Sequence, residues 1–477
     1  MKYGHSKIVL LSFIIVLAFS NLIFSQGIPD VLRLGQPGLG LGARALGMGN
    51  SYIALSEDAS AMFFNPAGLG LMNRIEVSGG LNYDKVKNNT TFFNSRTNAT
   101  DNSTKFNRFS IVLPYPTSQG SLVFGASFNS VKNFNTSMSF DGFNKGSNSM
   151  IQSLLNTDIP FDLFLTDTLN NTLINGRLNQ SGSILSKGSI NNWAFSGAVE
   201  ISKNLFVGLT INGISGSFSS NNDYFEDDTK NLYQGEVVAG DPFTTDFRTL
   251  HLNRILNWNL KGWFAKAGLL YQINKHARFG ATVRFPQYYT IEEQFLVSGY
   301  SKFGTNNFVD LSTDKYSDNV RYDIVTPFVL SAGFSFNASG LILSAQSSFT
   351  DYTQLSIENP QGLSSQYVGG VNKDINNSLT QVFSYNLGAE YTIPALGLRI
   401  RGGYFVQPSA YKNDPSKFDR KYVTAGIGFL LTQNVGIDIG YAHGLWKNVG
   451  DNYDVNVSRT FQDITYDRIL VDLTYRL

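Results

Sequence analysis

The feature that most constrains the fold is a short segment, repeated along the chain, in which apolar side chains alternate with polar or small ones. Segments of about ten residues show this alternation from Ile75 onward, as in 422–431 (YVTAGIGFLL). Successive side chains of a strand point to opposite faces, so each segment has one apolar face and one polar or small face. Repetition of this pattern along a chain is typical of a barrel whose apolar face contacts lipid.

The connections between these segments alternate in length. Short ones such as Ser202–Asn204 and Thr432–Asn434 alternate with long ones rich in Asn and Ser, such as Asp84–Lys105, Thr353–Leu379 and the longest, Val131–Gly188. Outer-membrane barrels are built this way, with turns at the periplasmic rim and loops outside, whereas a soluble sandwich has no reason to keep this rhythm. We count about fourteen segments, and therefore predict an all-β fold, an antiparallel transmembrane barrel over residues 75–477.

The composition fits a barrel in lipid. Charged residues make up 15% of the chain and aromatic residues 13%, and the formal net charge is +1. This balance gives no argument for nucleic acid as a partner. Cysteine is absent, which excludes a disulfide framework and thiolate chemistry.

The N-terminus has the three-part layout of a secretory signal peptide. Lys2 and Lys7 precede an apolar run over 8–24, and the small residue Ser25 follows. The alternative is a single membrane anchor, but the run is short and interrupted by polar residues for a stable span. We predict a signal peptide over 1–25 and an integral protein of the bacterial outer membrane.

Residues 26–74 differ from everything that follows them. Within this segment, 35–72 is rich in Gly and Ala, lacks strand alternation and contains at most one short helix, near 43–54. A segment of small residues cannot build a core of its own. We therefore expect 26–74 to pack inside the barrel as a plug.

Three motifs in this segment resemble the hatch of the FadL/TodX family, outer-membrane transporters of long-chain fatty acids and other hydrophobic compounds. They are GARALGMG at 42–49, ALSEDASA at 54–61 and FNPAGL at 64–69. The last motif contains the Asn-Pro-Ala signature, formed by Asn65, Pro66 and Ala67. The resemblance implies a hatch that blocks the lumen, ligand capture from outside, passage through the hatch and lateral exit through a kinked third strand.

The longest connection holds an amphipathic run that includes Leu154, Leu155, Phe161, Phe164 and Leu165. Apolar residues in an outside loop are unfavourable unless they pack or bind something. In the family, the corresponding loop forms the first capture groove, so the resemblance assigns these residues to ligand capture. The alternative is that the loop packs against the top of the barrel.

Gly125 interrupts the predicted third strand, and glycine in a strand often marks a bulge or kink. The resemblance places the lateral exit there. A glycine that merely accommodates the plug is the alternative interpretation.

Strand alternation places several charged residues on the lumen face, among them Arg284, Arg399 and Arg401. Because buried charge is rarely left alone, one interpretation is that they pair across the lumen and with Arg44 and Asp58 of the hatch, and so hold it in place. The sharper hypothesis is that one of the three arginines binds a cargo carboxylate, since a guanidinium suits that geometry.

No enzyme site is expected. The four histidines show no metal-binding spacing, and the glycines at 38, 40 and 42 follow no strand, which excludes a dinucleotide motif. We predict no catalytic residue, metal or cofactor. The leading hypothesis is a monomer that contacts outer-membrane lipid and passively takes up fatty acids or other hydrophobic small molecules. The alternative is a shuttle or scaffold for protein partners in type IX secretion.

Overall fold

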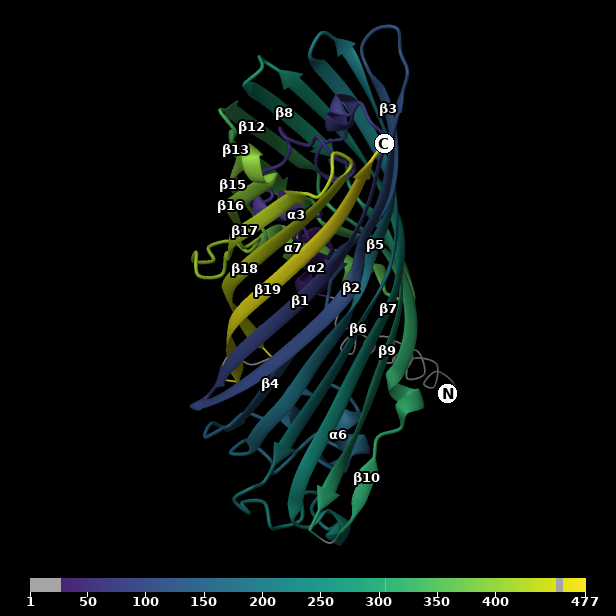
Figure 1. Cartoon of the computed structure of the whole chain (residues 1–477). Coiled ribbons are helices and arrows are strands. Elements are labelled where there is room, and N and C mark those ends of the chain that lie inside the picture. Colours follow the sequence, from purple (N-terminus) through teal and green to yellow (C-terminus); the bar gives the residue numbers. More distant parts are fainter. Residues whose placement is uncertain (1–26, 305, 452–457) are drawn as a thin grey trace, which may run out of the picture.

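The chain folds into one closed antiparallel barrel (Figure 1). The computed structural model describes residues 27–304, 306–451 and 458–477. Fourteen strands form the wall, and the last strand, β19 (Arg459–Arg476), pairs with the first, β1 (Glu76–Phe92), to close it. The predicted class and strand number are confirmed, whereas the predicted signal peptide lies outside the described residues.

Four wall strands consist of two consecutive segments, and a short further strand, β10, pairs with β9. The two-part strands are β3 with β4, β8 with β9, β11 with β12, and β13 with β14. Two of the breaks contain Pro286 and Pro327, which have no N–H to give to a ladder. In chain order, the strands between β1 and β19, including the segments of the two-part strands, are β2 (Ser95–Tyr115), β3 (Leu122–Asn133), β4 (Thr136–Phe143), β5 (Asn179–Ser202), β6 (Leu205–Asp227), β7 (Phe247–Gln272), β8 (Ala277–Arg284), β9 (Tyr288–Phe303), β10 (Phe308–Asp310), β11 (Ser317–Val325), β12 (Val329–Ala338), β13 (Leu341–Asp351), β14 (Ser356–Gln361), β15 (Gln381–Ile393), β16 (Leu398–Gln407), β17 (Arg420–Leu430) and β18 (Val435–Asp451).

The helices are short, and most belong to the N-terminal segment or to loops. They are α2 (Ile28–Gly35), α3 (Ala43–Gly47), α4 (Ala61–Phe64), η1 (Pro66–Leu71), α5 (Met150–Ser153), α6 (Ile159–Asp162), η2 (Pro242–Thr244), η3 (Thr313–Tyr316), η4 (Tyr352–Gln354), α7 (Ser365–Ser378) and η5 (Pro394–Leu396). In the described part of the chain, no helix is both long enough and apolar enough to cross a bilayer.

The outside of the barrel carries an apolar belt. On β17, Val423, Ile427 and Phe429 are exposed, whereas Tyr422 and Thr424, on the other face, are buried. β15 follows the same rule, with Tyr385 and Leu387 exposed and Asn386 buried, so the predicted apolar faces of these strands point outward. A soluble sandwich would bury them against a second sheet, so this is a barrel built to face lipid.

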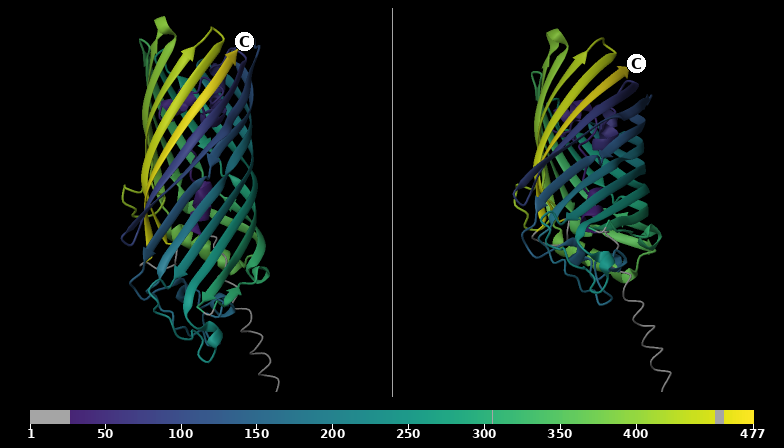
Figure 2. Two further views of the ribbon diagram at one scale, coloured as in Figure 1. Left: turned by 60° about the horizontal axis from the view of Figure 1, so that its bottom comes forward. Right: turned by 90° about the horizontal axis from the view of Figure 1, so that it is seen from below.

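The wall is tall on one side and short on the other (Figures 1 and 2). β5, β6 and β7 have 24, 23 and 26 residues, whereas β15, β16 and β17 have 13, 10 and 11. Since a strand crosses a bilayer with about 9–11 residues, the tall side projects beyond the membrane. We call the projecting end of the barrel the loop rim. The opposite end, which carries Glu76 and the short connections, is the turn rim.

The tall strands correct one expectation about the loops. The segment 84–105, predicted as a long connection, is a regular hairpin in which β1 and β2 are joined at Phe93 and Asn94. Beyond the membrane both faces of a strand meet polar surroundings, so the alternation that marks a lipid-facing strand is lost there.

The N-terminal segment lies inside the barrel (Figure 2, purple), as predicted for a plug. Glycines in the wall allow its backbone to lie directly against the strands. A Cβ added at Gly388 would lie 2.2 Å from the carbonyl oxygen of Met48, and one at Gly440 would lie 2.4 Å from that of Ala43. Any larger side chain at these wall positions would push the plug away.

Candidate functional site

The part of the lumen near the turn rim is dominated by ion pairs between the plug and the wall. Arg401 of β16 lies 2.6 Å from Glu390 and 2.6 Å from Asp438. Arg44 of α3 lies 2.8 Å from the same Glu390 and 3.0 Å from Glu57. The pairing that we predicted for Arg44 and Arg401 is therefore present, and it ties the plug to three strands and to itself.

A second group of ion pairs lies within the wall, and its carboxylates Asp472 and Glu76 accept hydrogen bonds from backbone N–H groups of the plug, at Ala43 and Ala59. Asp472 of β19 lies 3.1 Å from Arg108 and accepts a hydrogen bond of 2.5 Å from the backbone N–H of Ala43. Glu76 of β1 pairs with Arg476 at 2.8 Å. Buried charges are stabilised when they are paired in this way.

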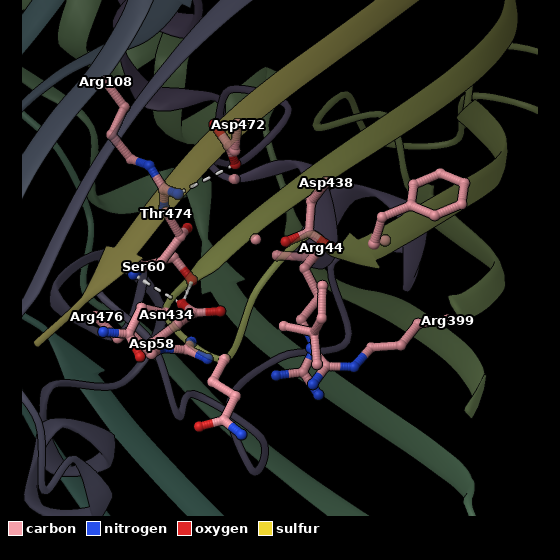
Figure 3. Close-up of a pocket in the computed structure, with 17 residues that line it drawn as sticks. Arg44, Asp58, Ser60, Arg108, Arg399, Asn434, Asp438, Asp472, Thr474 and Arg476 are labelled. Atoms are coloured by element: carbon pink, nitrogen blue, oxygen red, sulfur yellow. Dashed lines mark hydrogen bonds and ion pairs between the residues drawn. The ribbon is translucent and has the colours of Figure 1, made fainter. Parts of the chain in front are cut away.

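Charge is balanced in this region, which we call the turn-rim network. Its six arginines are Arg44, Arg108, Arg278, Arg399, Arg401 and Arg476, and its six carboxylates are Glu57, Asp58, Glu76, Glu390, Asp438 and Asp472. Figure 3 draws the 17 residues that line a polar pocket inside it and labels ten of them, among them Arg44, Arg399 and Asp438. The cavity measures about 40 Å³, which holds a few water molecules but no fatty acid.

The Asn-Pro-Ala signature fixes one end of the plug. The Asn65 amide donates to the carbonyls of Ile53 (2.9 Å) and of Leu269 in β7 (3.0 Å). Its oxygen accepts from the N–H of Ala67 (3.1 Å) and so caps η1, with Pro66 as the first helical residue. Asparagine is a preferred N-cap, and proline is preferred at the position after it. The signature thus has a structural role that couples plug and wall.

Toward the loop rim, the lumen is filled by a packed cluster of buried apolar side chains, which we call the apolar chamber. The plug contributes Val31, Leu32 and Leu34 from α2, and a loop contributes α7. Buried wall and loop residues of the same cluster include Phe218, Trp258, Leu260, Ile291, Tyr322 and Leu355. The guanidinium of Arg33 lies 4.1 Å from the centre of the Phe218 ring.

Three cations border the apolar chamber without a carboxylate partner in the described residues. Lys132 of β3 donates to the carbonyl of Gln36 (2.7 Å) and to that of Arg33 at the end of α2. Lys266 of β7 donates to the carbonyl of Phe63. Arg284 of β8 has a buried Nε with no hydrogen-bond acceptor. All three residues are partly exposed.

The predicted capture residues divide into two groups. Leu154 and Leu165 are buried in a cluster that closes the loop rim, and Leu155 is half-buried. Phe161 and Phe164 are 43% and 42% exposed, and the Phe164 ring contacts Phe243 at 5.8 Å. Loop packing therefore accounts for the first group and leaves the two phenylalanines open to the outside.

The third strand is broken, but not at Gly125. Gly125 pairs regularly with Val112 and Ser196, and an added Cβ would lie 2.9 Å from the sulfur of Met62 in the plug. The register of β3 against β5 shifts instead between Ser130 and Lys132. Gly125 is small because the plug lies against it, as the alternative interpretation held.

The β2–β3 ladder ends just before this shift, at Arg108 and Asn129. Beyond it, side chains bridge the two strands: Lys105 donates to Asn133 at 2.9 Å and Asn107 to the carbonyl of Ser130 at 3.4 Å. The seam between β2 and β3 is therefore weakest at this height.

Sequence reasoning missed Lys132 and α7, because both lie in segments predicted as loops. A signal for α7 was present: Val368, Val371 and Ile375 have helical spacing. Lys132 carried no such signal, since its role depends on where the plug ends.

Comparisons with known proteins identify a fold but no sequence family. No protein-family model and no curated protein matches the chain. A solved FadL homologue from Pseudomonas aeruginosa has a TM-score of 0.58 and 12% identity, with 92% of this chain and 99% of that chain covered. For the toluene transporters TodX of P. putida and TbuX of Ralstonia pickettii, the TM-scores are 0.54 and 0.52, the identities 14% and 17%, and the coverage the same. The chain thus has the fold of the FadL-type channels, as the hatch motifs indicated.

Proposed function

We propose that this FadL-like barrel is an integral outer-membrane channel for passive uptake of hydrophobic molecules that carry a carboxylate, such as long-chain fatty acids. The observation that carries the proposal is the apolar chamber bordered by Lys132, Lys266 and Arg284. An amphiphilic acid matches both properties of such a site. Its hydrocarbon chain packs among the apolar side chains, and its head group neutralises the cations.

The energetics favour this class of cargo. Each buried methylene contributes about 0.8 kcal/mol, so a long chain is held by the chamber alone. A guanidinium binds a carboxylate with two parallel hydrogen bonds. Toluene, the cargo of TodX and TbuX, has no charge and would leave three cations unmatched.

The proposed route begins at the loop rim. Phe161 and Phe164 offer apolar surface for capture, and the chamber receives the molecule next. Lateral exit into the membrane would use the weak seam between β2 and β3, near Ser130, instead of Gly125. The turn-rim network keeps the plug in place and blocks straight passage of water and solutes.

The test is to purify the protein from membranes and identify co-purifying lipids by mass spectrometry. Proteoliposome uptake is then measured with fluorescent dodecanoate and its neutral alcohol analogue. We expect amphiphilic acids in the extract and preferential uptake of the dodecanoate. A protein that carries no amphiphile and shows uptake at the level of empty liposomes would support the alternative, a scaffold for secretion partners.

A further inference from the structure

The wall of the apolar chamber lacks a strand at one position. β14 pairs with β11 on one edge, and the next strand, β15, begins only at Gln381 and pairs with β13. Above the short strands β15, β16 and β17, the described residues therefore provide no ladder partner for the second edge of β14. We call this gap the notch.

Helix α7 closes the notch. Its residues Val368, Val371 and Ile375 are buried in the apolar chamber. On β14, the backbone N–H of Ile357 donates to the Asn372 side chain at 2.8 Å, and the Asn372 amide donates back to the Ile357 carbonyl at 2.9 Å. One side chain thus replaces the hydrogen bonds of a missing strand, and an exposed edge is avoided.

The sequence of α7 is poorly suited to a permanent helix. Gly369 and Gly370 occupy its interior, and glycine is the weakest helix former apart from proline. Neither glycine has a positive φ, and a Cβ added at either would meet nothing within 4 Å. The closed structure therefore accommodates alanine at both positions, so neither packing nor backbone conformation requires glycine there.

We propose that α7 is a gate on a side entrance to the apolar chamber. The helix unwinds at Gly369–Gly370, the Asn372 contact with β14 breaks, and the notch opens at the outer surface of the membrane. Hydrophobic molecules captured at the loop rim then reach the apolar chamber through the notch instead of through the packed cluster of loop residues such as Leu154 and Leu165. The identity of the cargo rests on the proposed function, whereas the opening of α7 does not.

The first test measures amide hydrogen exchange of the full chain in lipid nanodiscs without cargo. We expect amides of α7 to exchange at least about a hundredfold faster than those of β15, because local opening exposes them. The double variant Gly369→Ala/Gly370→Ala should slow this exchange about tenfold. Gly213→Ala in β6, where an added Cβ also meets open space, is the matched control and should change nothing. Exchange of α7 as slow as that of β15 would overturn the gate.

The second test compares uptake of fluorescent dodecanoate into proteoliposomes. The Gly369→Ala/Gly370→Ala variant should lower uptake severalfold, and Asn372→Ala, which removes the contact with β14, should raise it. A purely structural α7 predicts that both variants lower uptake or leave it unchanged, and either result contradicts the gate. If the unmodified protein takes up no dodecanoate, the proposed function fails, and the exchange measurement alone decides on the gate.

Discussion

The turn-rim network and the apolar chamber both contain arginines that face the lumen. Only in the turn-rim network do carboxylates lie near all of these arginines. Arg401 lies between Glu390 and Asp438, whereas Arg284, on β8, forms no ion pair with a carboxylate in the part of the chain that the structure describes. Matched charge holds two parts of a protein together, and unmatched charge beside apolar surface is available to a ligand. The presence or absence of a carboxylate partner therefore decides the role of a lumen arginine.

The largest effect is expected from Arg401→Ala. The change leaves Asp438 without an ion-pair partner in the described residues and Glu390 with Arg44 alone, and the loss of one member of a buried ion pair costs about 3–5 kcal/mol. Urea unfolding in detergent and protease sensitivity of the plug measure this loss. Arg399→Ala is the control, because the structure assigns Arg399 no salt bridge within the described residues. Equal stability of both variants would remove the distinction between matched and unmatched arginines.

Arg284→Ala should have the opposite profile. We expect nearly unchanged stability but a roughly tenfold loss of dodecanoate uptake, since a hydrogen bond to a charged group contributes about 1.5–3 kcal/mol. Uptake of the neutral alcohol should stay the same. Arg284→Lys, which retains the charge but not the two-pronged geometry, should recover part of the activity. A parallel loss for both probes would show that Arg284 only shapes the lumen.

Asn65→Ala tests how the plug is held against the wall, and its expected effect on stability is smaller. The variant loses the cap of η1 and the hydrogen bond to Leu269, so we expect a loss of about 1–2 kcal/mol. Urea unfolding and hydrogen exchange of residues 61–71 measure it. Selectivity between dodecanoate and its alcohol should not change, and a shift in that selectivity would place Asn65 in the cargo path.

Phe161→Ser with Phe164→Ser should have the mildest effect. Both rings are already half exposed, so stability should change by less than about 1 kcal/mol. Uptake at low cargo concentration should fall a few fold for acid and alcohol alike, because capture precedes contact with the cations. Leu154→Ser, in the buried cluster, should instead destabilise the loop rim. Unchanged uptake in a folded Phe161/Phe164 variant would exclude these residues from capture.

The barrel and its plug could be predicted from sequence because each leaves a local signal. Lipid on one side and the lumen on the other impose the two-residue alternation seen in 422–431, and the small residues of 42–49 cannot form a core alone. The tall hairpin of β1 and β2 left no such signal, since water surrounds its upper part and polar residues occur on both faces.

The candidate site was harder to predict because the role of each residue depends on which side chains lie next to it in the folded protein. Alternation shows that Arg284 and Arg401 both face the lumen, but it does not show which of them meets the carboxylates of Glu390 and Asp438. The break in the third strand was misplaced for a related reason. Gly125 has the residue type of a kink, whereas the register shift between Ser130 and Lys132 lies in the pairing of β3 with β5, which no residue type in the third strand indicates.

The contact between Ala43 and Asp472 has a consequence for how the protein is made. It joins the first part of the described chain to its final strand, and β19 in turn seals the cylinder against β1. A plug that fills the interior cannot be threaded through a finished wall. Biogenesis must therefore proceed around the N-terminal segment, and zipping of the last seam captures it for the lifetime of the molecule.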